Sequence, residues 1–142
     1  METILQDLAE LEPFHVILPP CPYNINDSIS RKTRRVKEHI ARTKYLKQRH
    51  KQLYYYYCLG QLLEDVDLTK AQRLEIKHQV TSYQYVVAIR IYRIFEHSVD
   101  QIFRTRSCRL KSFHQLTADE VTSLCAFNEN IFNGAENLEA EN

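Results

Sequence analysis

The chain has 142 residues, of which 44% are hydrophobic, and its 19 Lys and Arg nearly balance 18 Asp and Glu. This length suits one domain with a modest core. Only two glycines occur, Gly60 and Gly134, which argues against an all-β fold and against a glycine-rich phosphate-binding loop. The composition therefore favours helices.

Cysteine usage and the N-terminal residues bear on the cellular compartment. The four cysteines are too far apart to form a zinc-binding pair. The first residues are acidic where a secretory signal would be basic, so disulfides are not expected. Arg90 and Arg93 interrupt the densest apolar stretch, which argues against a membrane span. We expect a soluble, intracellular protein with reduced thiols and without a metal or cofactor.

The charge is distributed unevenly. Residues 28–115 contain all 19 Lys and Arg and seven acids, a net charge of +12. The two flanks contain the other 11 acids and neither Lys nor Arg. A basic body with acidic ends suggests an anionic partner, or tails that shield the body.

The first 26 residues are expected to form a separate N-terminal segment. Residues 2–12 have the apolar spacing of a short amphipathic helix. Four prolines then favour an extended strap over residues 13–26. Phe14, Val16 and Leu18 alternate along it, so we expect the strap to lie across an apolar groove.

A first long helix is predicted over residues 28–64. Asp27 and Ser28 are good N-cap residues, and no strong breaker follows before residue 64. Gly60 suggests a close helix–helix contact. The half before Leu53 is charged nearly all round, because arginines take the seam positions and lysines the opposite side.

A second long helix is predicted over residues 69–106. Thr69 and Gln72 form a capping-box pattern at its start. Two adjacent apolar stripes on it cover an arc of about 200°, more than one partner helix can bury. A second copy of the chain or another protein could cover the rest, which predicts a homodimer or an obligate partner. The predicted partner interface is Tyr85, Tyr92, Phe95 and Val99.

A third, short helix is predicted over residues 118–132. Thr117 and Glu120 form its capping box, and Asn133-Gly134 is expected to end it. An acidic, disordered tail is expected over residues 135–142. The predicted fold is thus all-α: an antiparallel hairpin of two long helices with a short third helix packed on it, forming one bundle domain over residues 27–134. In this hairpin, residue i lies opposite residue 134 − i.

The functional prediction follows from a basic run. Residues 31–51 contain ten Lys or Arg and one acid, Glu38, and the hairpin would place further arginines opposite them. Guanidinium groups suit bidentate contacts with phosphates, and Tyr45 and Tyr54–Tyr57 could stack on bases. We expect a non-catalytic protein that binds a polyanion, foremost RNA or DNA. The candidate contact residues are Arg31, Arg34, Arg35, Lys37, Arg42, Lys44, Arg49, Arg93, Arg104 and Arg106.

Three alternatives stay open. Glu96 and Asp100 could neutralise the seam arginines across the hairpin, leaving an ordinary solvated face. The aromatic face of the second helix could make the protein an adaptor or assembly subunit. Several Arg and His residues also have the Arg-x(4–6)-His spacing of HEPN-class helical ribonucleases, although the polar residue usual after the arginine is missing. These pairs are Arg34–His39, Arg73–His78, Arg90–His97 and Arg109–His114.

Overall fold

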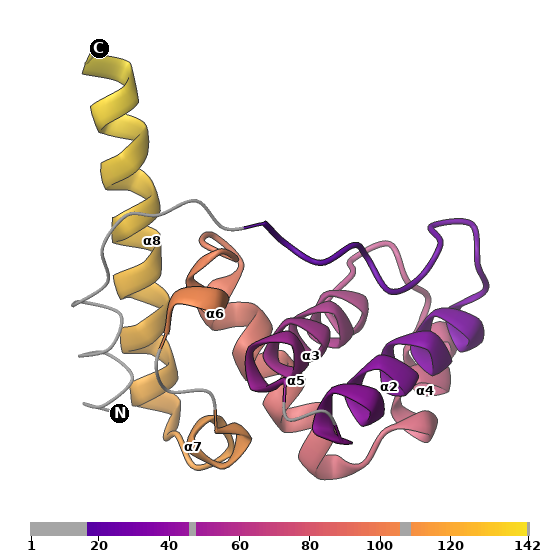
Figure 1. Ribbon diagram of the computed structural model, residues 1–142. Helices are drawn as coiled ribbons and strands as arrows, with labels where there is room; N and C mark the ends of the chain where they lie inside the picture. The colour runs from indigo at the N-terminus through magenta and orange to yellow at the C-terminus, as the bar shows by residue number, and fades with distance from the viewer. Residues whose placement is uncertain (1–16, 46–47, 106–108, 142) are drawn as a thin grey trace.

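The computed structural model describes the backbone of residues 17–45, 48–105 and 109–141, and side chains as far as Glu129, Tyr45 excepted. Every regular element in these ranges is a helix, so the predicted all-α bundle is confirmed (Figure 1). The predicted helix at residues 2–12 lies outside them. The helices are α2 (Ile29–Tyr45), α3 (Arg49–Leu63), α4 (Lys70–Gln79), α5 (Ser82–Phe95), α6 (Gln101–Arg104), α7 (Leu110–His114) and α8 (Ala118–Glu141).

The first predicted long helix is divided. It is interrupted after Tyr45, and α2 folds back to pack against α3. The Gln48 N–H donates to the Thr43 carbonyl at 3.0 Å. The Gln52 side chain donates to the Ile40 carbonyl at 3.2 Å, which joins the two helices directly. Because α2 folds back, its few apolar residues reach the core. In a straight helix that extended beyond the bundle, these residues would be exposed to water.

The second predicted long helix is divided as well. The capping box of Thr69 and Gln72 is confirmed at the start of α4. A second capping box starts α5, where the Gln84 N–H donates to Thr81 Oγ1 at 3.1 Å and the Thr81 N–H to Gln84 Oε1 at 3.0 Å. Val80 is extended, with φ −117° and ψ 152°, so α4 ends there. The prediction of one continuous helix overlooked this repeated Thr-x-x-Gln pattern.

The last helix starts where expected and ends later. The Glu120 N–H donates to Thr117 Oγ1 at 3.2 Å, and the Thr117 N–H to Glu120 Oε1 at 3.0 Å, which confirms the predicted capping box. The α8 backbone continues through Gly134 to Glu141, so the predicted end of the helix at Asn133-Gly134 is wrong. One glycine inside a helix costs only about 1 kcal/mol relative to alanine and does not by itself stop the helix.

Helices α3 and α5 form the centre of the bundle. Tyr56 of α3 lies beside Gln84 of α5, whose side-chain amide can donate to the Tyr56 oxygen. Gly60 lies against Ala88, and Glu64 pairs with Arg93. These contacts advance in the same direction along both helices, because α4 returns the chain between them. The predicted antiparallel register of 134 − i is therefore wrong, whereas the expected close contact at Gly60 is confirmed.

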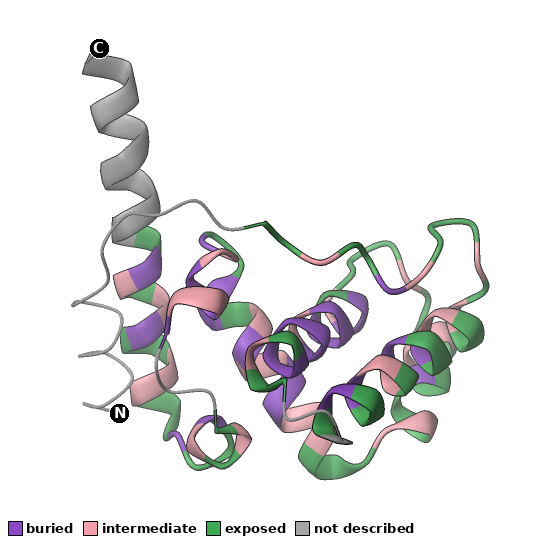
Figure 2. Ribbon diagram, viewed as in Figure 1, coloured by how far each residue is buried: buried purple, intermediate pink, exposed green. Residues whose placement is uncertain are grey.

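The broad apolar arc of α5 is covered within the chain (Figure 2). Val87, Ile91 and Phe95 are fully buried. Phe113 of α7 lies 6.1 Å from Phe95 between ring centroids, and α8 packs on α5 beside it. The Asn128 side chain of α8 donates to the Ile94 carbonyl at 2.7 Å. Among the helices described, none has the length and apolar character to cross a membrane.

Candidate nucleic-acid interface

The buried side chains of α2 lie along a narrow strip, beside which the half-buried Lys32 and His39 contact Tyr23 and Tyr55. The buried side chains are Thr33, Val36, Ile40 and Thr43. At 100° per residue these lie within an arc of about 80°. The buried hydroxyls donate to main-chain carbonyls of the same helix, Thr33 to Ile29 and Thr43 to His39, both at 2.8 Å, so they need no outside partner. Most of the circumference of α2 therefore remains available for contacts with a ligand.

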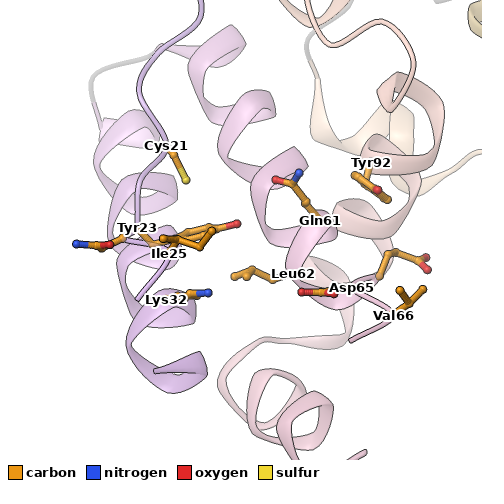
Figure 3. Close-up of a pocket in the computed structure, with 11 residues that line it drawn as sticks. Cys21, Tyr23, Ile25, Lys32, Gln61, Leu62, Asp65, Val66 and Tyr92 are labelled. Carbon is orange, nitrogen blue, oxygen red and sulfur yellow. The ribbon is translucent and has the colours of Figure 1, made fainter. Parts of the chain in front are cut away.

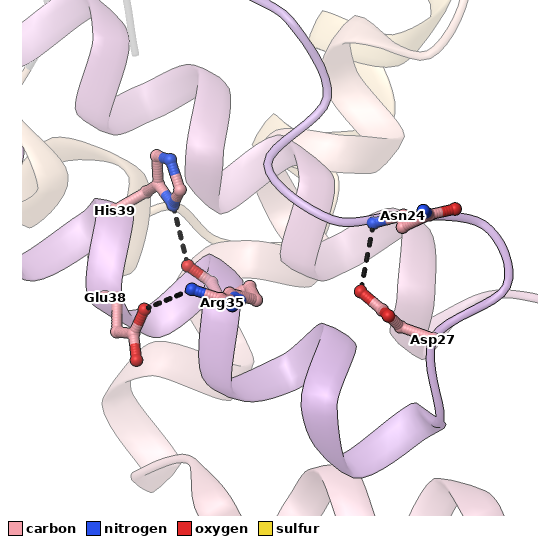
Figure 4. A network of polar contacts seen from close by, with 5 residues as sticks. All are labelled: Asn24, Asp27, Arg35, Glu38 and His39. Carbon is pink, nitrogen blue, oxygen red and sulfur yellow. Dashed lines mark hydrogen bonds and ion pairs between the residues drawn. The ribbon is translucent and has the colours of Figure 1, made fainter.

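The uncovered part of α2 is strongly basic. The helix contains seven Lys or Arg and one acid, Glu38, a net charge of +6. Glu38 accepts one ion pair, from Arg35 at 3.6 Å, and both side chains are nearly half exposed (Figure 4). Among the described residues, no acid from another element pairs with an α2 cation. The charge is therefore concentrated on one helix and is little neutralised by the fold.

The structure brings together most of the predicted contact residues. Arg31, Arg34, Arg35, Arg42 and Lys44 are exposed on α2, and Lys37 is half-buried. Arg49 is exposed at the start of α3, the next helix in the chain. We call the six α2 residues the basic face. These six residues are close together because they lie on the same helix, so their proximity does not depend on the predicted hairpin.

The predicted arginines beyond α2 do not join this face in the way expected. Two side-chain nitrogens of Arg93 contact Glu64 at 2.7 and 2.8 Å. Arg104 is only 10% exposed and pairs with Asp100 at 3.5 Å. Arg106 lies outside the described residues. The prediction that the open end of a hairpin gathers these arginines opposite the basic run is wrong, because the chain folds back at two additional points.

The tyrosine cluster of α3 is part of the core. Tyr54, Tyr55 and Tyr56 are buried, and Tyr57 is half-buried between Tyr54 and Tyr92, with centroid distances of 6.3 and 5.3 Å. Burial raises the pKa of Tyr56 and of Tyr57 to about 12 in each case. Tyr54, Tyr55 and Tyr56 are therefore too buried for the predicted stacking of bases. The side chain of Tyr45, the other predicted stacking residue, lies outside the described residues.

Neutralisation of the seam arginines across a hairpin is not observed. Glu96 lies 3.5 Å from the neighbouring His97, and Asp100 pairs with Arg104 on α6. Both acids therefore pair with residues near them in the sequence. They do not neutralise the positive charge of the basic face.

Most residues of the predicted partner interface are buried or half-buried within the bundle. Phe95 is fully buried, so its prediction as an interface residue is wrong. Tyr92 is half-buried against Tyr57 and Gly60. Tyr85 is half-buried beneath the Lys77 ammonium, 5.2 Å from its ring centroid, and Val99 packs on the core. Helices α3, α7 and α8 bury most of the arc that motivated this prediction, while Tyr83 is exposed.

The arginines of two ribonuclease-like pairs have evident structural contacts. Arg73 donates to the Asp65 carbonyl at 2.9 Å, which holds the turn before α4. Arg90 donates to the carbonyls of Phe113 and His114 at the end of α7. His114 stacks on Tyr83 at 4.6 Å between ring centroids. These contacts give Arg73, Arg90 and His114 structural roles in the fold.

The proline strap borders the basic face. Tyr23 packs against the core, and the Lys32 ammonium lies 5.5 Å from its ring centroid. A hollow of about 780 Å³ separates the strap from the end of α3, with Tyr23, Lys32 and Asp65 in its lining (Figure 3). Leu18, the one described member of the predicted apolar alternation, is exposed, so it does not lie in an apolar groove, and the intervening Ile17 is 89% exposed. Phe14 and Val16 lie outside the described residues.

Comparisons with known proteins do not place the chain in a family. No protein-family model, curated protein or solved structure matches it significantly. The described residues form a small helical bundle in which helix α2 is strongly cationic.

Proposed function

We propose that this protein binds nucleic acid through the basic face of α2, without catalysing a reaction. One observation carries the proposal: α2 has a net charge of +6, has its buried side chains along a narrow strip and has one internal ion pair. Holding like charges together destabilises a fold unless a partner supplies the opposite charge. A phosphate backbone supplies that charge densely and in an extended form.

The side chains on this face favour contacts with phosphates. Four of the six are arginines, whose planar guanidinium groups bind phosphate oxygens in pairs. Tyr54, Tyr55 and Tyr56 are buried in the core, so these three rings cannot serve as a platform for sequence-tolerant base stacking. The contacts of these arginines and lysines with phosphates should therefore be electrostatic and should not depend on sequence.

Charge reversal tests the proposal. Replacing Arg35, Arg42 and Arg49 by Glu should weaken binding to single-stranded RNA and duplex DNA of any sequence, measured by fluorescence anisotropy at low salt. A control of equal charge change replaces the exposed residues Lys70, Arg109 and Lys111 by Glu. This control should lose much less affinity, because none of the three lies in the basic stretch of chain from Arg31 to Arg49. Circular dichroism verifies that both variants are folded.

Two results would contradict the proposal. One is a Kd weaker than about 10⁻⁴ M for both nucleic acids, below ordinary non-specific affinity. The other is an equal loss of affinity in the two triple variants, which would show that only net charge matters. A protein-docking role would then be the better hypothesis. The α5–α8 groove of about 480 Å³, lined partly by Val86, Ile89 and Val121, would be its first candidate surface.

A further inference from the structure

The exposed residues of α2 form three lines along the helix. At 100° per residue, Arg31, Arg35 and Arg42 lie within about 40° of one another. Lys37 and Lys44 lie within about 20° of each other, and the two cationic lines are about 150° apart. Between them, and opposite the buried strip, is an outer line formed by Arg34, Glu38 and Ala41, all of which are exposed. The helix therefore has two cationic flanks, and the outer line between them combines a basic, an acidic and a small apolar side chain.

Neighbouring elements leave this outer line uncovered. The strap runs beside one flank, where Asn24, Asp27, Arg31 and Arg35 line a hollow of about 490 Å³. On the other side, the Gln79 amide of α4 donates to the Ser30 hydroxyl at 3.2 Å, close to the start of α2. The outer line lies between these contacts, and α2 lies at the edge of the bundle (Figures 1 and 2).

We propose that α2 enters the major groove of duplex DNA. The flanks would contact the phosphates of the two groove walls, and Arg34, Glu38 and Ala41 would face the base edges. This inference rests on the proposed nucleic-acid binding and names the form of nucleic acid. An α-helix with its side chains is about 10–12 Å across, and the major groove of B-form DNA is about 12 Å wide. The 17 residues of α2 span about 25 Å, enough to follow the groove for several base pairs.

The three chemistries of the outer line match base edges in that groove. Arginine donates to guanine O6 and N7, glutamate accepts from the cytosine amino group, and a small apolar side chain contacts the thymine methyl group. The exposed Arg35–Glu38 pair can be exchanged for a phosphate contact by Arg35, which frees Glu38. Duplex RNA fits less well, because its A-form major groove is too deep and narrow for side chains to read. Single strands commonly stack their bases on aromatic rings, and Tyr54, Tyr55 and Tyr56 are buried and cannot receive them.

The test compares three forms of one sequence by fluorescence anisotropy at the same salt: duplex DNA, duplex RNA and single-stranded DNA. Duplex DNA should bind about ten-fold more tightly than duplex RNA. Ala41→Leu adds bulk on the outer line and leaves the charge unchanged. It should weaken binding to duplex DNA about five-fold or more, with little effect on the other two forms. Ala126→Leu, at an exposed position of α8, is the matched control and should have no effect.

Groove-specific dyes provide a second measurement on the unmodified chain. Methyl green, which occupies the major groove, should compete with the protein for duplex DNA, and netropsin, which occupies the minor groove, should not. Equal affinity for the three forms, with Ala41→Leu neutral or netropsin as the competitor, would overturn the major-groove inference while leaving nucleic-acid binding intact. Failure to bind all three forms would overturn the proposed function itself.

Discussion

Gly60 is the position where the central helix pair comes closest, and its replacement by alanine tests the packing of the bundle. A Cβ atom at residue 60 would lie 2.5 Å from Tyr92 Cβ and 2.9 Å from the Ala88 carbonyl carbon, with the Ala88 carbonyl oxygen nearer still. Ordinary contacts of this kind begin at 3.4 Å. Two of these atoms belong to the backbone of α5, so rotation of a side chain cannot relieve the clash.

Two opposing effects set the size of the change. Alanine in place of glycine inside a helix gains about 1 kcal/mol in helix propensity. Extra volume in a close-packed core costs about 1–3 kcal/mol, and more where the backbone must move. Here α3 and α5 would have to separate by roughly 1 Å along fully buried contacts such as Leu59 and Ile91. We expect the overpacking cost to exceed the propensity gain, with a net loss of about 2 kcal/mol in the free energy of unfolding.

Urea denaturation followed by circular dichroism measures this loss, and the melting temperature should fall by about 6–8 °C. Gly60→Val should cost more than Gly60→Ala, because the larger side chain forces a larger separation. Gln61→Ala is the matched control: it changes an exposed residue of the same helix and should stay within about 0.5 kcal/mol of the unmodified protein. If Gly60→Ala raised the stability, helix propensity would dominate and the close α3–α5 contact would be refuted.

Three further predictions concern a helix cap, a buried amide and the tyrosines. Thr81→Ala removes the cap of α5 and should cost about 1 kcal/mol in urea denaturation, whereas Ser82→Ala, at the next and exposed position, should change little. Asn128→Ala removes the buried bond to the Ile94 carbonyl and should cost about 1–3 kcal/mol, and an unchanged urea midpoint would contradict that role. Burial raises the pKa of Tyr56 and Tyr57 from 10 to about 12, so their contribution to stability is complete below pH 10 and is lost as the pH rises through 12. Absorbance at 295 nm should therefore show late tyrosine ionisation that coincides with loss of helicity, and ionisation of every tyrosine near pH 10 in the folded protein would refute this.

Local sequence signals predicted much of the helical content. The Thr69–Gln72 and Thr117–Glu120 boxes start helices as expected, because a cap depends on a few adjacent residues. The buried strip of α5 was visible in its apolar spacing, and Gly60 indicated a close contact. The concentration of charge in α2 was equally visible, since it depends on composition alone.

The break before α5 had a local signal in Thr81 and Gln84, whereas the break after Tyr45 could not be predicted with the same ease. Neither proline nor glycine marks the interruption after Tyr45, and folding back there is favoured by burial of Val36 and Ile40, a tertiary effect. An undetected break reverses the chain, so the predicted register failed with it. For the same reason the sequence could not show that Arg93 and Arg104 are engaged in ion pairs away from the basic face.

The salt dependence of nucleic-acid binding tests the central claim most directly. Fluorescence anisotropy of the unmodified protein and of the Arg35, Arg42 and Arg49 to Glu variant, titrated at several salt concentrations, gives the slope of log K against log salt. We predict a linear decrease, with a slope of about −0.7 to −0.9 per phosphate contacted, and a slope shallower by about two to three phosphates in the variant. A binding constant that does not change with salt, or the same slope for both proteins, would contradict phosphate binding by this surface.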